Sequence, residues 1–409
     1  MAQRRAQRRH GWTGPGRCVC TAVSDRTRSL KPEGAYKVLQ QAGKLEALGR
    51  SVCHLEIGQP SGNAPQHVCD AALSAITSGD TKYVYPSGVD RLRHAVAHHV
   101  SSTRNADVSP SNVVIGPGCK PGLFNAANAL VNTGSELVYP DPGFPTYKAL
   151  ADVTSASGVP VLLKADGSGP DMNALRCRLS ENTALVIINS PSNPTSGVMP
   201  EEDVRELVRL AHEYDFVILS DEIYSQLVFN EAGKALSPLS LAPERTVMVD
   251  GASKAYRMTG WRLGWTIAPE HIARTMGLLA VHSFGCTSPF VQAAGIAALE
   301  GPQDDVYAMR EEYMQKRDYV CDSLNAMDGI SCVRGEGAFY AFPNCESLDA
   351  GNAEEVSSRI LQEEGVALLP GTDFGEQGEG HVRISFVGSW ESLEDGMERL
   401  SRFAQKQKQ

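Results

Sequence analysis

The sequence predicts an α/β fold, in which a mostly parallel sheet of about seven strands lies between helices and a smaller α/β domain accompanies it. Short apolar runs of strand length alternate with helical patterns through the middle of the chain, an order typical of parallel sheets covered on both faces. The chain has 409 residues, enough for roughly two or three domains and a large core. The strands are predicted at 113–115, 136–139, 159–163, 184–189, 216–220, 246–250 and 262–268.

Helices are predicted where apolar residues recur at helical spacing. The first, at 34–49, ends at Gly49, and residues 52–57 then alternate like a short strand. A long charged helix at 303–327 reads as a linker into the C-terminal part of the chain. The other predicted elements are helices at 67–78, 90–101, 122–131 and 201–214 and strands at 338–342 and 382–386.

Composition excludes several classes of protein. The net charge of −10 argues against a nucleic-acid partner. We find no apolar run long enough to span a bilayer, so a membrane protein is not expected. The ten cysteines are scattered without a CxxC pair, so no metal site is predicted and free thiols in a reducing cytoplasm are expected.

The N-terminus is rich in arginine. Residues 1–31 hold seven arginines and Lys31 against Asp25 as the one acidic residue. Such a segment can be a mitochondrial transit peptide, but its amphipathic pattern is poor. We therefore expect residues 1–29 to be a disordered tail or the result of an early start codon, with a targeting peptide as the alternative. The expected location is cytoplasmic, and the alternative is mitochondrial.

The segments with the most chemical information lie between residues 188 and 265. They read IINSPSNPTSG, FVILSDEIY and VDGASKAYRMTGWRLGW. Each brings polar residues to the end of a predicted strand, where ligands bind in parallel sheets. The residues, in chain order, are Asn193, Asp221, Tyr224, Lys254 and Arg262. They supply what pyridoxal 5′-phosphate (PLP) needs: an amine for its aldehyde, a carboxylate for its ring nitrogen, donors for its phenolate oxygen and a guanidinium for its phosphate.

Each residue type suits its predicted contact. Lys254 becomes a nucleophile when burial and neighbouring cations lower its pKa, which allows a Schiff base with PLP. Asp221 would keep the ring nitrogen protonated, and Arg262 would bind the phosphate through paired donors. The sequence GPGCKPG lies between a predicted strand and a helix, where backbone N–H groups attract an anion. The predicted donors there are Gly118, Cys119 and Lys120, while Asn193 and Tyr224 are expected to contact the phenolate oxygen.

This ordered set resembles the class I and II aminotransferases of PLP fold type I, most closely the subgroup with the bacterial aspartate aminotransferases. The resemblance covers roughly residues 29–405. It implies a tail at 1–29 and a small domain in which 30–60 packs with 301–409. The large PLP-binding domain would then be 61–300.

The resemblance also implies further site residues. Arg383, in HVRIS, would bind the substrate α-carboxylate with Gly58 and Asn193. Phe144 would stack on PLP. Tyr83, with Tyr85 as a competitor, would reach the phosphate of the neighbouring subunit and imply a homodimer with shared active sites.

One position departs from the family. Many relatives carry a phosphate-binding serine three residues before the lysine, where this chain has Gly251. Ser253 is the expected replacement.

The predicted activity is transfer of an amino group between an L-amino acid and a 2-oxo acid, with Lys254, Asp221 and Tyr224 as catalytic residues. Glutamate and 2-oxoglutarate would form one couple. Aspartate, or a neutral or aromatic amino acid, would belong to the other. Lys120 stands where acidic-substrate relatives bind the distal carboxylate, but Glu33 occupies a segment that holds small hydroxyl residues in those relatives.

Two alternatives remain open from the sequence. Another PLP enzyme of the same fold, such as a carbon–sulfur β-lyase or a tailoring cyclase, would use the same cofactor residues. A non-catalytic regulatory domain is the second alternative. The retained Lys254, Asp221 and Arg262 argue against it, as does the short segment in front of the catalytic pattern, which is too short for a helix-turn-helix domain.

Overall fold

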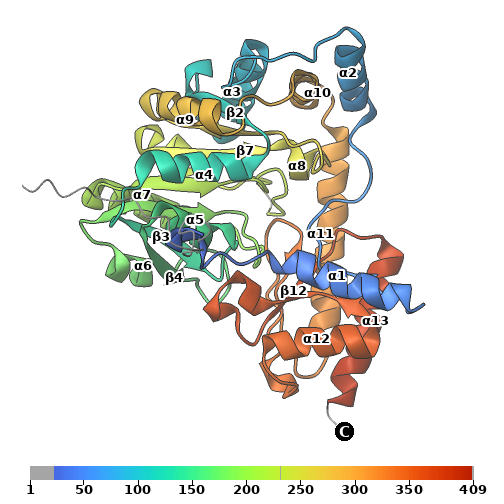
Figure 1. Cartoon of the computed structure of the whole chain (residues 1–409). Helices are drawn as coiled ribbons and strands as arrows, with labels where there is room; N and C mark the ends of the chain where they lie inside the picture. The colour runs from blue at the N-terminus through green and yellow to red at the C-terminus, as the bar shows by residue number, and fades with distance from the viewer. Residues whose placement is uncertain (1–22, 231, 408–409) are drawn as a thin grey trace, which may run out of the picture.

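The computed structural model describes residues 23–230 and 232–407. It has a large part, in which helices enclose a central sheet, and a smaller part built from the segment that begins at Gly34 and from the C-terminal region (Figure 1). The two parts are joined by the long helix α11 (Asp304–Asn325), which runs from one into the other. This architecture confirms the predicted α/β class.

The central sheet has seven strands in the order β2-β8-β7-β6-β5-β3-β4. Strand β8 is antiparallel to both of its neighbours, and the other pairs are parallel. Each strand overlaps one predicted apolar run, so the prediction of a mostly parallel seven-stranded sheet is confirmed. The strands are β2 (Val113–Gly116), β3 (Glu136–Asp141), β4 (Ser157–Leu162), β5 (Thr183–Asn189), β6 (Val217–Asp221), β7 (Thr246–Gly251) and β8 (Gly264–Ile267).

Both faces of the sheet are covered because its strands send apolar side chains alternately to either side. Helices α4 (Cys119–Leu130), α5 (Thr146–Thr154) and α9 (Glu270–Ser283) pack on one face. The other face is covered by α2 (Gln66–Thr77), α3 (Asp90–Arg104), α6 (Met172–Arg178), α7 (Glu201–Tyr214) and α10 (Pro289–Glu300). Helix α3 extends past its predicted end at residue 101 as far as Arg104, whose side chain is anchored in the protein interior.

In the smaller part, helix α1 (Gly34–Ala47) packs against residues of the C-terminal region, including Leu361 and Leu369. A parallel pair joins β1 (Cys53–His54) to β10 (Val366–Ala367). A second sheet has the order β11-β12-β9, with strands Leu369–Pro370, Val382–Ser385 and Tyr340–Ala341. Helices α12 (Ala353–Glu364) and α13 (Trp390–Lys406) complete this part.

The predicted strand at 52–57 is shorter than expected. It pairs as a strand at Cys53–His54, and Leu55 still donates its N–H to the Ala367 carbonyl at 2.9 Å. Beyond it, the carbonyl groups of Glu56 and Gly58 accept hydrogen bonds from side chains of Arg383 and Lys254. After Leu55 the segment leaves the sheet, and the Glu56 and Gly58 carbonyl groups bond to side chains between the two parts instead of to a neighbouring strand.

The N-terminal prediction falls largely outside the described residues, which begin at residue 23. The described part of the segment predicted to be unstructured, residues 23–29, contains a short 3₁₀ helix, Asp25–Thr27, in which the Thr27 hydroxyl donates to the Ser24 carbonyl at 2.9 Å. Within the described chain, no helix has the length and apolar character needed to cross a membrane. The same residues contain no cluster of three or more histidine, cysteine or acidic side chains placed to hold a metal ion.

Candidate active site

Most of the predicted site residues of the large part come together at the carboxyl ends of the central strands. Asp221 is the last residue of β6, and Asn193 lies in the loop after β5. Lys254 lies in the short helix α8 (Ala252–Ala255), which follows β7 directly. Gly118 caps the N-terminus of α4. The parallel arrangement brings these segments to one edge, as the strand order requires.

Lys254 reaches into the interior between the two parts of the molecule. Its Nζ donates to the Gly58 carbonyl at 2.6 Å and lies 5.6 Å from the centre of the Phe339 ring. Burial and then the positive charge of Arg383 lower the pKa of Lys254 to about 8, with smaller contributions from Lys120 and Arg262. A larger fraction of this amine is therefore neutral near pH 8 than for an ordinary lysine.

Asp221 is buried, and its carboxylate is held by donors. The Tyr147 hydroxyl donates to Oδ2 at 2.9 Å, and the Ile223 N–H donates to Oδ1 at 3.4 Å. Burial raises the pKa of Asp221 to about 6, against the lowering effect of these two hydrogen bonds. Such a carboxylate has much to gain from a cationic partner, because burial of its charge is costly.

Tyr147 was not predicted as a site residue. It lies in the first turn of α5, three residues after Phe144, and the two rings meet edge to face with centroids 5.8 Å apart. In the sequence DPGFPTY, the two aromatic residues Phe144 and Tyr147 are three positions apart at the start of α5. This spacing places them on the same side and could have indicated Tyr147. Tyr147 now connects Phe144 with Asp221.

A cradle suited to an anion forms where β2 leads into α4. Gly118 has φ +94°, and a Cβ there would lie 2.3 Å from Nη2 of Arg262, so the guanidinium lies directly against the glycine backbone. The same Nη2 donates to the Pro117 carbonyl at 3.1 Å. The first N–H groups of α4, from Cys119 onwards, have no partners within their own helix. Beside them, a cavity of about 650 Å³ is lined in part by Pro117, Arg257 and Arg262.

The departure at Gly251 has a packing reason. A Cβ at this position would lie 2.8 Å from the Leu263 carbonyl oxygen and 3.0 Å from Sγ of Cys119. A serine therefore does not fit without movement of β8 or α4. Ser253, the expected replacement, is buried in α8 next to Lys254.

Arg383 lies in a closed aromatic pocket. Its guanidinium lies 4.3 Å from the Tyr340 ring centre and 4.9 Å from that of Phe374. Nη1 donates to Oδ1 of Asn193 at 3.1 Å and Nη2 to the Glu56 carbonyl at 2.6 Å. Nε is buried and has no hydrogen-bond partner among the described residues. A planar carboxylate matches such a guanidinium.

Tyr340 was also missed from the sequence. Its hydroxyl forms a hydrogen bond of 2.9 Å with that of Tyr224, although 116 positions separate the two residues. A Cβ at Gly58 would lie 2.1 Å from the same Tyr340 oxygen, so only glycine lets this segment approach. The structure thus brings Gly58, Asn193, Tyr224 and Arg383 together around a tyrosine that no local pattern singles out.

Lys120 and Glu33 form an ion pair at the edge of the site. Nζ of Lys120 lies 5.1 Å from the centre of the Phe144 ring. The pair is half-exposed, and it joins the N-terminus of α4 to the residue before α1.

Tyr83 and Tyr85 are not brought into the cluster, since they are 97% and 68% exposed in the loop between α2 and α3.

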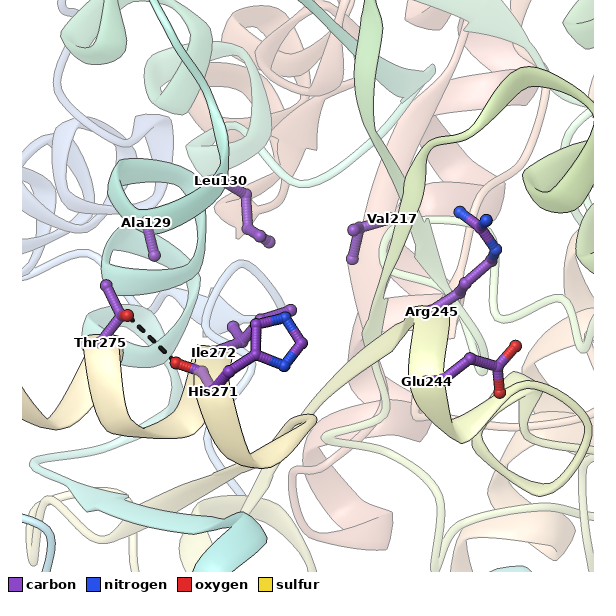
Figure 2. Close-up of a pocket in the computed structure, with 8 residues that line it drawn as sticks. All are labelled: Ala129, Leu130, Val217, Glu244, Arg245, His271, Ile272 and Thr275. Carbon is purple, nitrogen blue, oxygen red and sulfur yellow. Dashed lines mark hydrogen bonds between the residues drawn. The ribbon is translucent and has the colours of Figure 1, made fainter.

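A second pocket, of about 380 Å³, lies elsewhere on the sheet (Figure 2). It is lined by Val217 at the start of β6, Arg245 before β7 and Ile272 in α9. It therefore opens at the amino ends of the strands, opposite to the Lys254 site. None of the predicted site residues lines it.

Comparisons with known proteins show to which family the chain belongs. The family model for aminotransferase class I and II matches residues 50–400. The aspartate aminotransferase of Pyrococcus horikoshii is 34% identical over 389 residues, covering 94% of this chain and 98% of that protein. The solved structure of the Thermus thermophilus aspartate aminotransferase with maleate has a TM-score of 0.88 at 34% identity, covering 93% and 99% of the two chains. Alanine aminotransferase from Pyrococcus furiosus has a TM-score of 0.90 at 30% identity, covering 94% and 100%.

These matches confirm both the predicted family and the predicted fold type I architecture. The chain belongs to the class I and II aminotransferases and is an enzyme of the type to which aspartate aminotransferases belong.

Proposed function

We propose that this aminotransferase binds PLP on Lys254 and that the cluster described above is its active site. The main support is the amine itself: Lys254 is half-buried between two parts of the molecule, its Nζ is held by the Gly58 carbonyl, and its pKa is lowered to about 8. The surroundings fit the rest of the cofactor. Asp221 is a buried carboxylate at the end of β6, the strand next to β7, and Arg262 with the Gly118 backbone forms an anion cradle.

When bound, PLP supplies an aldehyde that accepts the amino group and a ring that delocalises the electrons released at the substrate Cα. The residues of this chain do the rest. Arg383 binds the α-carboxylate and so fixes the Cα–H bond in a reactive orientation. Lys254 takes the Cα proton as general base and delivers it to the carbon that bears the amino group at the end of the half-reaction.

Asp221 and Tyr224 support this proton transfer. The Asp221 carboxylate, oriented by Tyr147, would hold a proton on the ring nitrogen. Tyr224 and Asn193 would contact the phenolate oxygen, while Phe144 would cover one ring face. Phe144 is positioned for this by its contact with Tyr147.

Transamination, unlike a lyase or cyclase reaction, requires an amino-group acceptor. We expect the purified enzyme to consume an amino acid only when a 2-oxo acid is present, with 2-oxoglutarate as an effective acceptor. A screen of amino donors with 2-oxoglutarate, followed by detection of glutamate, measures this. Pyruvate or ammonia formed from the donor without any acceptor would contradict the proposal and favour a β-lyase.

We propose glutamate and 2-oxoglutarate as one substrate couple and leave aspartate and neutral or aromatic donors as candidates for the other. The two solved relatives named above are described as acting on aspartate in one case and alanine in the other. In this chain, the Glu33–Lys120 ion pair should discriminate between aspartate and a donor with a neutral side chain. A distal carboxylate can pair with Lys120 only if it displaces Glu33, whereas a neutral side chain leaves the pair intact.

Two substitutions should separate these effects. Lys120→Ser should lower kcat/KM for aspartate by at least about tenfold, because a charge-assisted contact is lost, and should change it much less for alanine or phenylalanine. Glu33→Gln should raise kcat/KM for aspartate, because the Glu33 carboxylate no longer competes with the substrate for Lys120. Steady-state kinetics with the three donors measures both. Equal losses for all donors in Lys120→Ser would show that Lys120 serves only the anion cradle.

We also propose a two-fold homodimer in which Tyr83 contacts the cofactor phosphate of the partner subunit. An aromatic ring that is 97% exposed in one chain supports this assignment. Analytical ultracentrifugation should show a dimer, and Tyr83→Phe should weaken cofactor affinity by about tenfold or more, because a hydrogen bond to a charged group is lost. Tyr85→Phe is the control and should leave the affinity unchanged. A fully active monomer would contradict the proposal.

We propose a cytoplasmic location, with which the cysteines are consistent. The eight cysteines of the described chain are free thiols, as a reducing compartment permits. The mitochondrial alternative depends on the arginine-rich N-terminus, which lies mostly outside the described residues. Cell fractionation of the full chain against a variant without residues 1–22 would separate the two.

A further inference from the structure

A histidine and a buried glutamate lie directly behind the pocket of Arg383. Nδ1 of His54 and Oε1 of Glu56 are 2.8 Å apart, and the Glu56 side chain is fully buried while that of His54 is 36% exposed. On the outer side, Nε2 of His54 meets the exposed Glu46 of α1 at 3.2 Å. The mechanism above uses none of these three side chains.

The Glu56 carboxylate depends on His54. Its second oxygen, Oε2, is buried and has no hydrogen-bond partner among the described residues. A buried carboxylate is costly unless it is paired. The bond with His54 is therefore what fixes this side chain in the interior.

The backbone of the same segment holds two residues of the site. The Glu56 carbonyl accepts from Nη2 of Arg383 at 2.6 Å, and two residues on, the Gly58 carbonyl accepts from Nζ of Lys254 at 2.6 Å. On the other side of Glu56, the Leu55 carbonyl accepts from the Ser385 N–H at 2.7 Å. Beyond Leu55, the segment is held in place by the Glu56 side chain and by the hydrogen bonds from Arg383 and Lys254 to its carbonyl groups.

We propose that His54 and Glu56 form a positioning pair: the imidazole fixes the buried carboxylate, and thereby the two carbonyl groups that hold Arg383 and Lys254. This inference rests on the proposed function, since it assigns the pair to the receptor for the substrate α-carboxylate. The pair itself does not touch substrate. Its effect should fall on carboxylate affinity more than on the rate of proton transfer.

The pair should also make carboxylate binding depend on pH. Burial lowers the pKa of His54, but the hydrogen bonds and charges of Glu56 and Glu46 outweigh burial, so the pKa lies above its ordinary value. Below that pKa the contact is a charged pair. As pH rises through it, the imidazole loses its positive charge and holds the Glu56 side chain less firmly, so binding of an anionic substrate should weaken.

Other charged groups near the pair come from three elements. Glu46 of α1 faces the outer nitrogen of His54, and Arg383 of β12 lies on the inner side of Glu56. Asp395 and Arg399 of α13 act on the neighbouring Cys53. Because these four groups remain in a His54 variant, comparison of variant and parent isolates the contribution of His54.

The test uses the holoenzyme with its aldehyde form of the cofactor and 2-oxoglutarate, which binds there without being transaminated. Calorimetric titration from pH 6 to 9 gives Kd for the parent, His54→Phe, His54→Asn and the control Glu46→Gln. We expect His54→Phe to raise Kd about tenfold, because a charge-assisted bond is lost, while kcat changes little. His54→Asn keeps a neutral donor and should show an intermediate Kd without the pH step. Glu46→Gln should stay within about twofold of the parent, since an exposed pair contributes little.

Hydrogen exchange of the ligand-free protein separates this inference from the proposed function. Amides at 55–58 should exchange faster in His54→Phe than in Glu46→Gln, whatever the substrate is. Equal exchange and equal Kd in these two variants would overturn the positioning pair. Failure of the parent to bind 2-oxoglutarate would instead overturn the proposed substrate couple. The exchange measurement would still show whether His54 fixes residues 55–58.

Discussion

Replacement of Lys254 by alanine should lower kcat/KM by at least about 10⁴-fold, because the variant would lose both the amine proposed to hold the cofactor and the proposed general base. The neighbouring groups cannot replace it. The Nζ of Lys120 is paired with Glu33 and lies over Phe144, so it is held away from the position of the Lys254 amine. Steady-state assays with saturating added PLP measure this loss.

A matched control for Lys254→Ala is Lys234→Ala. Lys234 is a lysine in the loop after β6, and its replacement should leave kcat/KM unchanged. External amines should restore part of the activity of Lys254→Ala, since a small amine can act as the missing base. Full activity of Lys254→Ala without added amine would contradict the assignment.

Replacement of Arg104 by methionine should have the largest effect on stability. Arg104 is 4% exposed, and it donates through Nε to Glu222 at 2.8 Å and through Nη2 to Asp250 at 2.7 Å. Both carboxylates are equally buried. Removing the cation leaves two uncompensated charges, a loss that typically costs about 3–5 kcal/mol. Denaturant unfolding followed by circular dichroism measures the difference.

The same substitution should affect the active site, because the two carboxylates flank it. Glu222 directly follows Asp221, and Asp250 accepts from the Gly251 N–H at 2.7 Å just before the helix that carries Lys254. Arg104 thus ties the ends of β6 and β7 together. We expect weaker cofactor binding in Arg104→Met in addition to lower stability.

The stability loss of Arg104→Met should depend on pH. Burial raises the pKa of Asp250 to about 7 even with Arg104 present, against the lowering effect of that cation. A carboxyl whose folded pKa lies above its unfolded value destabilises the fold as pH rises through the folded pKa. The deficit should therefore be larger at pH 8.5 than at pH 6.

The control for Arg104→Met is Arg91→Met on the same helix. Arg91 pairs with Glu300 at 3.4 Å, but the two side chains are 75% and 52% exposed. An exposed pair of this kind contributes about 0–1 kcal/mol. Equal losses in the two variants would show that the buried network contributes no more than a surface pair.

Much of the fold could be predicted because its central strands are buried on both sides. Such strands appear in the sequence as short, nearly continuous apolar runs, and each of the seven runs became a strand. Helix α10 gave no comparable signal. It packs against both α2 and α3, so it is apolar around most of its circumference and lacks an amphipathic pattern. Helix α6 has seven residues, too few to establish a period.

Without the family resemblance, which implied Arg383 and Gly58, the proposed site could be predicted only where its residues follow strands in the sequence. Lys254, Asp221 and Asn193 were predicted in this way, because the carboxyl ends of parallel strands meet. Tyr340 and Arg104 could not be found. Each acts through a partner more than 100 positions away, Tyr224 and Glu222 respectively, and no local spacing encodes such a contact.

The central claim is that Lys254 carries the cofactor, and one measurement tests it directly. Borohydride makes the covalent bond between an aldehyde cofactor and a lysine amine permanent, so digestion and mass spectrometry can locate it. We predict a phosphopyridoxyl group on the peptide that contains Lys254, at close to one per chain. A stoichiometric label on any other lysine, with Lys254 unmodified, would contradict the account.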